Sequence, residues 1–355
     1  FEVPGWMAYV AAEHQNAREN VVLIDQSSFC KFEIQGPGAP KFLDHLCANR
    51  IDRPVGTVVY TQMCNDRGTI ECDMTIGRLA EDHFSLVMGT AFGLRASCWI
   101  EDHLPHDRSV TFTEVTSGYA ALNVAGPKSR ELLQKVSRAD FSSTAFPFSS
   151  VREITVGAAP VRAFRITYIG ELGYELYIPS EQALKVYDRL VEAGADYGLV
   201  HAGLSALGSL RLEKGYRDYG HDIDNTDNAF ETGLGFAVAV DKAGGFIGRD
   251  AAAAQKAGAP YERRLVQVFV EDPEPLLWHA EVIYRDDTAI GYVRAGSYGH
   301  TLGGAIGLAM IEPGEPVTTD YLGQGRWEID IAGTRFPCRC SLQPLYDPGM
   351  KRIRC

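Results

Sequence analysis

The pattern of apolar residues changes near residue 260, and this change limits the possible folds more than any other feature of the sequence. Before it, segments with the periodicity of helices alternate with segments that have the periodicity of strands. From Arg263 onward, short alternating segments follow one another, and turn residues rather than helices separate them. The C-terminal part is therefore expected to be a small all-β domain arranged as a barrel.

The part before the change is expected to belong to the α+β class. A strand, a Gly-Pro pair and an amphipathic helix follow one another at 32–48 and again at 119–136, which is a weak internal repeat. Residues 1–255 are therefore expected to form two intertwined α+β subdomains, and residues 256–355 the barrel domain. The Ala- and Gly-rich stretch 251–260 is the expected boundary.

The charge of the chain excludes some partners. Among its 355 residues, 34 Lys and Arg stand against 46 Asp and Glu, a net charge of −12. A nucleic-acid partner would require a basic face, so none is expected. The longest uncharged run, 295–311, contains five glycines and is shorter than the roughly 20 apolar residues of a membrane-spanning helix. No membrane partner is expected either.

Common chemical motifs are missing. No two of the eight cysteines have CxxC spacing, and Cys338 and Cys340 alone would make a poor metal site, so no metal is expected. Free thiols fit a reducing compartment, and a cytoplasmic location is expected. The sequence also lacks a GxGxxG motif after a strand, a P-loop, a GxSxG motif and an HExxH motif. These absences leave dinucleotide binding, P-loop chemistry, serine hydrolysis and zinc proteolysis unsupported.

The segment 69–76 is a clear strand in which polar and apolar residues alternate. Glu71, Asp73 and Thr75 share one face, and the apolar side chains share the other. The two carboxylates either lie on a solvated surface or line a cavity. In a cavity, a fixed carboxylate could stabilise a developing cation.

Two further segments carry candidate groups. In 167–177, two glycines bracket a turn, with Tyr168 and Glu175 on its two arms. This is either a plain hairpin with an exposed Glu175, or a buried carboxylate that accepts two parallel N–H bonds from a guanidine-like edge such as that of a pterin. The segment 210–224 is rich in charge and tyrosine. It is either a helix end with a polar turn or a calcium loop, although the loop's glycine and closing glutamate are missing.

Together these segments resemble the aminomethyltransferase family, that is, the T-protein of the glycine cleavage system and its relatives. The resemblance covers nearly the whole chain and rests on the order and spacing of several motifs. The matching pieces lie at 24–29, 60–68, 71–73, 168–175, 210–222, 233–236, 246–249, 298–303 and 306–309. Glu71-Cys-Asp73 and the segments 212–217 and 220–222 are most similar to the folate-binding portion of dimethylglycine and sarcosine dehydrogenases.

The resemblance implies a three-domain fold around a central tetrahydrofolate pocket, with tetrahydrofolate as the cofactor. Asp73 matches the catalytic aspartate of the family, which stabilises an iminium-like cation or positions the attacking amine. Glu175 matches the glutamate that binds the pterin, and Tyr168 matches the tyrosine on the opposite arm. Tyr60 and Tyr216 fall at pocket positions, where they could pack against the ring or its linker.

The chain departs from the T-protein at the contact with the folate tail. Where the T-protein has an arginine, this chain has Leu207. Arg211 lies one helical turn further on and is expected to reach the same carboxylates.

The resemblance implies an enzyme that transfers a one-carbon unit from an N-methyl or aminomethyl donor to tetrahydrofolate. Its expected partners are a small-molecule methylated amine and a flavoprotein module or subunit. Two alternatives remain open. One is a tetrahydrofolate-dependent demethylase of a small methylated compound. The other is a non-catalytic folate-binding regulatory module, since the regulatory subunit of pyruvate dehydrogenase phosphatase resembles the same dehydrogenases.

Overall fold

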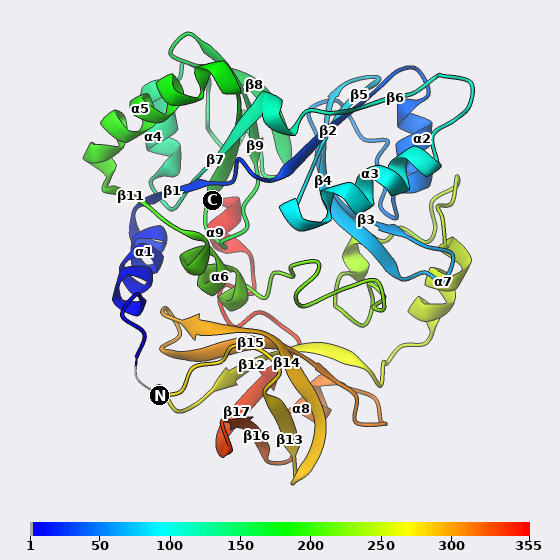
Figure 1. Cartoon of the computed structure of the whole chain (residues 1–355), viewed down its shortest axis with the longest axis vertical. Helices are drawn as coiled ribbons and strands as arrows, with labels where there is room; N and C mark the ends of the chain where they lie inside the picture. Colours follow the sequence, from blue (N-terminus) through cyan, green and yellow to red (C-terminus); the bar gives the residue numbers. More distant parts are fainter. Residues whose placement is uncertain (1–2) are drawn as a thin grey trace.

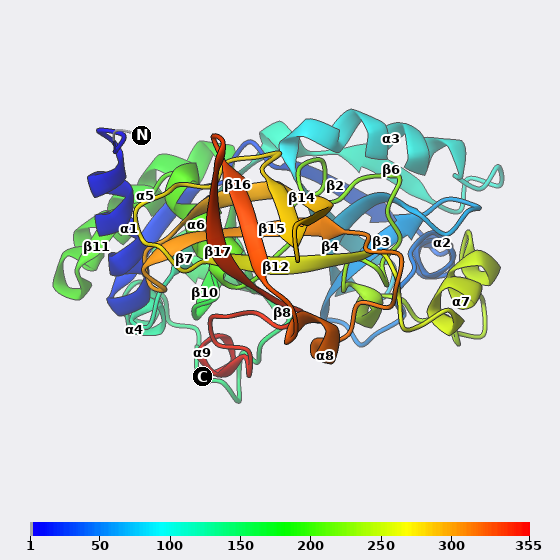
Figure 2. The same ribbon diagram turned by 90° about the horizontal axis from the view of Figure 1, so that it is seen from below.

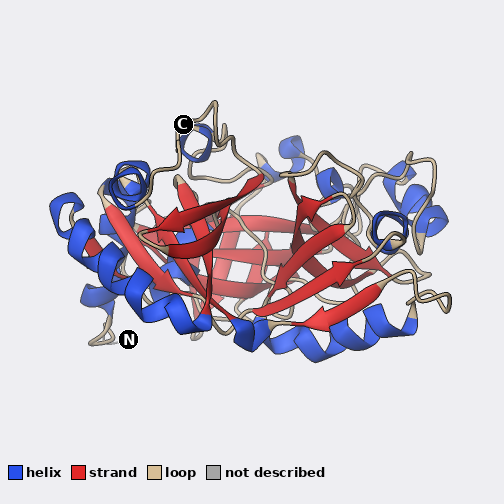
Figure 3. Cartoon of the chain, turned by 90° about the horizontal axis from the view of Figure 1, so that it is seen from above, coloured by secondary structure: helices blue, strands red, loops and turns tan. Residues whose placement is uncertain are grey.

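The computed structural model describes residues 3–355, in which two open sheets and one closed barrel surround a central region (Figure 1). Helices lie along the outer sides of both sheets (Figure 3). The expected α+β class with a C-terminal barrel is therefore confirmed. Within residues 3–355, no helix is both long and apolar enough to cross a membrane.

The first body is a six-stranded sheet. Its outer face forms a core with helices α4 (Ser129–Val136) and α5 (Ala183–Gly194), which contribute leucines and valines at helical spacing. In spatial order, its strands are β11 (Leu199–His201), β1 (Val21–Asp25), β7 (Tyr119–Ala125), β10 (Gly173–Pro179), β9 (Ala159–Arg165) and β8 (Ser150–Val156).

The second body is a five-stranded sheet covered by α2 (Ala39–Leu46) and α3 (Gly93–Asp102). The repeated unit seen in the sequence places α2 and α4 in equivalent positions, each after a Gly-Pro pair. In spatial order, its strands are β3 (Val58–Cys64), β4 (Ile70–Ala80), β5 (His83–Met88), β2 (Cys30–Gln35) and β6 (Thr111–Glu114).

The inner faces of the two sheets pack on each other. Val58 and Val87 of the second sheet contact Ala121 and Phe164 of the first in one buried cluster. The approach is close at Gly77 of β4, where an added Cβ would lie 2.5 Å from Cζ of Phe164. Glycine is therefore the residue that allows the two sheets to meet here.

The third body is the barrel (Figure 2). A core of alternating residues fills it, together with α8 (Thr319–Leu322), while its outer side packs on the second body. Most of the expected boundary stretch forms α7 (Arg249–Ala257). Around the barrel, the strands are β12 (Arg264–Val270), β15 (Gly304–Ile311), β14 (Thr288–Gly299), β13 (Val282–Arg285), β16 (Trp327–Ile331) and β17 (Thr334–Ser341).

Three segments join the bodies. Helices α1 (Met7–Glu19) and α6 (Leu204–Glu213) pack together on the inner face of the first sheet, and α6 also contacts β14 and β15 of the barrel. After β17, the chain leaves the barrel and ends in α9 (Lys351–Arg354) beside the first sheet (Figure 1). There the carbonyl of Cys355 accepts a hydrogen bond of 2.5 Å from Arg165.

Candidate functional site

Strands β3 and β4 place Tyr60 and Asp73 together. The alternation predicted for 69–76 is confirmed, because Cys72, Met74 and Ile76 enter the core under α2 and α3. Asp73 and its cross-strand neighbour Gln62 therefore face the other way, toward the first sheet. The Tyr60 hydroxyl donates a hydrogen bond of 2.7 Å to Oδ2 of Asp73.

The surroundings of Asp73 favour its neutral form. Burial raises the pKa of Asp73 to about 6, and the carboxylates of Asp218 and Asp222 act in the same direction, whereas the hydrogen bond from Tyr60 opposes this shift. A carboxyl group with such a pKa exchanges its proton near neutral pH, which suits a group that must hold either a proton or a charge.

Glu71 has a different environment, although it lies only two residues away. Its Oε1 accepts a hydrogen bond of 2.7 Å from Asn65, and its other oxygen pairs with Arg95. Both oxygens therefore have partners within the turn and α3, so Glu71 holds local structure together.

Glu175 of β10 is buried, with 7% of its surface exposed. The alternative of a plain hairpin with an exposed Glu175 is therefore wrong, because the second sheet covers this face. Burial raises the pKa of Glu175, and Tyr177 opposes this shift by donating a hydrogen bond of 2.5 Å to its Oε2. No hydrogen bond of the described chain reaches Oε1, so this oxygen can accept one from a ligand.

An unpaired amide lies beside Glu175. Asn123 of β7 is the direct cross-strand neighbour of Glu175, is 1% exposed, and has no hydrogen-bond partner for Oδ1 or Nδ2 among the described residues. Nε2 of Gln26 and Oε1 of Gln62 also lack partners there. Buried polar atoms are nearly always paired, so this group fits a site that a polar ligand completes. The sequence carried one signal that was missed: Asn123 is a lone amide in an otherwise apolar strand.

Two apolar clusters flank this polar group on the inner face of the first sheet. One cluster, with Ile24, Ala125 and Leu207, lies under α6. The other, with Ala121 and Tyr177, lies under the second sheet. Glu175 and Asn123 therefore lie on the first sheet at the boundary between the part covered by α6 and the part covered by the second sheet.

Tyr168 and Tyr216 form a second part of the site. Their rings are stacked, with centroids 5.8 Å apart and planes at 11°. The Tyr168 hydroxyl donates to the carbonyl of Arg217 at 2.5 Å. The rings thus tie the loop between β9 and β10 to the chain after α6. The carboxylates of Asp73 and Asp218 both raise the pKa of Tyr168, so the Tyr60–Asp73 pair lies in the same neighbourhood as these rings.

Arg211 has partners within the chain that the sequence did not indicate. Its guanidinium donates to both oxygens of Asp222, at 2.9 and 3.1 Å, and to the Tyr216 carbonyl at 2.9 Å. Both residues are buried. Arg211 thereby fixes the segment that carries Tyr216, and the predicted contact of its remaining N–H groups with a folate tail stays a prediction. Because the partner lies eleven residues away across a turn, helical spacing did not indicate it.

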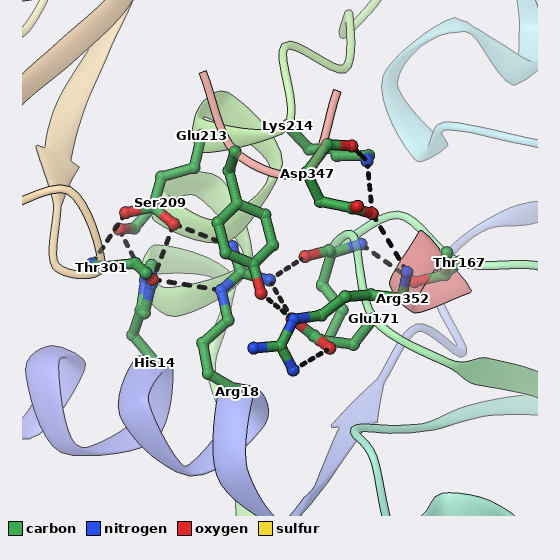
Figure 4. A network of polar contacts seen from close by, with 12 residues as sticks. His14, Arg18, Thr167, Glu171, Ser209, Glu213, Lys214, Thr301, Asp347 and Arg352 are labelled. Carbon is green, nitrogen blue, oxygen red and sulfur yellow. Dashed lines mark hydrogen bonds and ion pairs between the residues drawn. The ribbon is translucent and has the colours of Figure 1, made fainter. Parts of the chain in front are cut away.

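A buried polar network holds the loop that carries Tyr168 (Figure 4). Arg18 of α1 donates to the Ile169 carbonyl at 2.7 Å, to Glu171 at 3.0 Å and to Glu213 at 2.8 Å. Tyr346 of the C-terminal segment also donates to Glu171, at 2.5 Å. The calcium-loop alternative for 210–224 is not supported, because Asp222 pairs with Arg211 and the following Asp227 pairs with Arg294, and no group of three metal-ligating side chains is found among residues 3–355.

One aromatic ring of the site neighbourhood is exposed. Phe236 lies in a short helical turn (Gly235–Ala237), is 76% exposed and stacks on Tyr60, with centroids 6.2 Å apart. An exposed ring beside the Tyr60–Asp73 pair provides an apolar surface on which part of a ligand can lie.

Comparisons with known proteins cover almost the whole chain. Residues 1–242 match the family model described as the GCVT N-terminal domain, and residues 263–347 match the glycine cleavage T-protein C-terminal barrel domain. The aminomethyltransferase T of the glycine cleavage system from Bartonella henselae has a similar fold, with a TM-score of 0.84 over 96% of this chain and 90% of that chain, at 22% identity.

Three curated relatives are longer than this chain. The 4-methylaminobutanoate oxidase (formaldehyde-forming) of Paenarthrobacter nicotinovorans is 40% identical over 99% of this chain and 42% of its own length. The mitochondrial pyruvate dehydrogenase phosphatase regulatory subunit of Mus musculus is 36% identical over 97% of this chain and 41% of its own length. The mitochondrial sarcosine dehydrogenase of Homo sapiens is 34% identical over 95% of this chain and 38% of its own length. The chain thus spans about two fifths of each.

Proposed function

Because the chain belongs to the glycine cleavage T-protein family, we propose that it binds tetrahydrofolate and takes part in one-carbon transfer to it. The observation that carries this proposal is the buried Glu175 beside the unpaired amide of Asn123, in a family of folate-dependent transferases. The family and the named oxidase and dehydrogenase relatives indicate an enzyme.

The residues fit a pterin with a folate tail. A carboxylate accepts the two parallel N–H bonds of the pterin's guanidine-like edge. Among residues 3–355, Glu175 is a buried carboxylate that has Tyr177 and no cation as its hydrogen-bond partner. The stacked Tyr168 and Tyr216 supply flat apolar surface for the ring or its linker. Arg211, held by Asp222, keeps the segment with Tyr216 in place, and its remaining N–H groups are proposed to reach the tail.

Asp73 is assigned the catalytic role. Tetrahydrofolate supplies the nitrogen atoms to which a one-carbon unit becomes attached. Because its pKa is about 6, Asp73 can gain or lose a proton near neutral pH. Its charged form stabilises positive charge beside these atoms or takes up a proton from an attacking amine. Tyr60 holds the Asp73 carboxylate in one orientation by its hydrogen bond.

The proposed donor is an N-methyl amino acid, and the proposed partner is a flavoprotein module or subunit that oxidises it. The names of two relatives, an oxidase of 4-methylaminobutanoate and a dehydrogenase of sarcosine, support this class of donor. The chain corresponds to about two fifths of those proteins, so the oxidising part is assigned to the remaining length or to a separate subunit.

A folate-binding regulatory module is the second candidate, which the similarity to a phosphatase regulatory subunit favours. Both candidates require folate binding, and only the first requires Asp73 for turnover. A demethylase that acts directly on a methylated compound would yield 5-methyl- rather than 5,10-methylene-tetrahydrofolate, which mass spectrometry distinguishes.

Calorimetric titration with tetrahydrofolate tests the proposal. We expect micromolar binding by the unmodified chain, a loss of roughly tenfold or more in Glu175→Gln, and retained binding in Asp73→Asn. Glu181→Gln, at an exposed position, is the matched control and should bind normally. Absence of binding to the folded, unmodified chain would contradict the proposal, and equal binding by Glu175→Gln would contradict the assigned pterin contact.

A further inference from the structure

Asn123 lies next to Glu175 in a place that no structural role explains. It is the direct cross-strand neighbour of Glu175 and shares its face of the sheet. The carboxamide is 1% exposed, and neither Oδ1 nor Nδ2 has a hydrogen-bond partner among residues 3–355. An unpaired buried amide destabilises a fold, so a residue of this kind indicates a partner that the chain itself does not supply.

The chemistry of the proposed ligand matches a carboxamide. Glu175 takes the edge of a pterin that offers two N–H groups. Each remaining edge of a tetrahydropterin offers one acceptor beside one N–H donor: the ring carbonyl oxygen with N5–H, and N1 with N8–H. A carboxamide offers a donor and an acceptor side by side, which is the complement of either edge.

The oxidation state of the pterin changes this match. In fully oxidised folate, N5 and N8 carry no hydrogen, so both edges present only acceptors. One of the two hydrogen bonds to a carboxamide is then lost, and the amide oxygen faces another acceptor. Glu175 makes the same bonds to both forms, so it does not distinguish between them.

We infer that Asn123 selects the tetrahydro form of the pterin over the fully oxidised form. The inference rests on the proposed function and deepens it, because it assigns specificity for the reduced cofactor to one residue. The unpaired Nε2 of Gln26 provides a further donor near the same face of the sheet. The discrimination expected from one hydrogen bond is about tenfold in the ratio of dissociation constants.

The test is a titration of the full chain with two named probes, tetrahydrofolate and folic acid, for the unmodified chain and for Asn123→Leu. Leucine has a similar shape and no polar atoms. We expect the variant to lose about tenfold in its preference for tetrahydrofolate. We also expect its melting temperature without ligand to stay equal or to rise, because an unpaired buried amide has been removed.

Asn228→Leu is the matched control. Asn228 is also buried, but its Oδ1 accepts hydrogen bonds from Phe230 and Glu231 at 2.9 and 3.0 Å. This variant should melt at a lower temperature and keep the preference between the probes. An unchanged preference in Asn123→Leu, or a fall in its melting temperature like that of the control, would overturn the inference alone. Absence of binding to both probes would overturn the proposed function as well.

Discussion

At the scale of the residue, the pKa of Asp73 has a consequence for stability. Because burial raises this pKa to about 6, the folded chain binds the proton more tightly than the unfolded chain does. The resulting stabilisation is complete below about pH 4 and is lost as the pH rises through about 6. Asp73→Asn should therefore gain up to about 2 kcal/mol over the unmodified chain between pH 4 and pH 8. Denaturant unfolding at several pH values measures this difference, and a difference independent of pH would contradict it.

Tyr60 sets the same pKa through a hydrogen bond that favours the charged carboxylate. Tyr60→Phe removes this bond, so the pKa of Asp73 should move upward. Carbon-13 NMR titration of the Asp73 carboxyl group measures the shift. Tyr9→Phe, at an exposed position of α1, is the control and should leave the titration unchanged. A downward shift in Tyr60→Phe would mean that the bond favours the neutral form instead.

At the scale of the element, the contact between the two sheets depends on Gly77. An added Cβ would lie 2.5 Å from the Phe164 ring, which is buried, so we expect Gly77→Ala to push the sheets apart. We expect a loss of about 1–3 kcal/mol in the free energy of unfolding and weaker tetrahydrofolate binding. In Gly89→Ala, the added Cβ meets no atom within 4 Å, and this control should change neither quantity. Equal stability of the two variants in urea would show that the ring of Phe164 simply turns aside.

Local sequence patterns predicted the helices and strands well. The features they did not predict depend on contacts between residues far apart in the sequence. Alternation is a property of a single strand, so the two faces of β4 followed from the sequence alone. The burial of Glu175 comes from a sheet about one hundred residues earlier, which no local pattern indicates. The pairing of Arg211 with Asp222 was not predicted, because Asp222 lies beyond the helix end. Of the predicted site residues, Tyr60 contacts Asp73, and Tyr216 contacts both Tyr168 and Arg211.

At the scale of the whole molecule, Arg18 is the cation that joins three segments. It pairs with Glu171 and Glu213, both buried. Burial alone would raise the pKa of Glu213, but bonds from His14 and Arg18 lower it to about 2, so this stabilisation is present above about pH 4.5 and is lost toward pH 2. Arg18→Met should lose about 3–5 kcal/mol at pH 7 and less at pH 3. Arg326→Met, in an exposed pair, should lose less than about 1 kcal/mol in the same unfolding experiment. A similar loss in the free energy of unfolding for both variants would show that the buried network stabilises the fold no more than an exposed ion pair does.

The connections of the barrel have a mechanical consequence. The chain enters the barrel from α7, which lies against the second body, and leaves it toward the first body, while the two sheets also touch each other directly. Each of the three bodies is thus joined to both of the others. No body can rotate relative to a second one without also disturbing its contacts with the third. A displacement of one body is therefore resisted by its contacts with both of the others. We therefore expect the three bodies to keep their relative positions when a ligand binds between them.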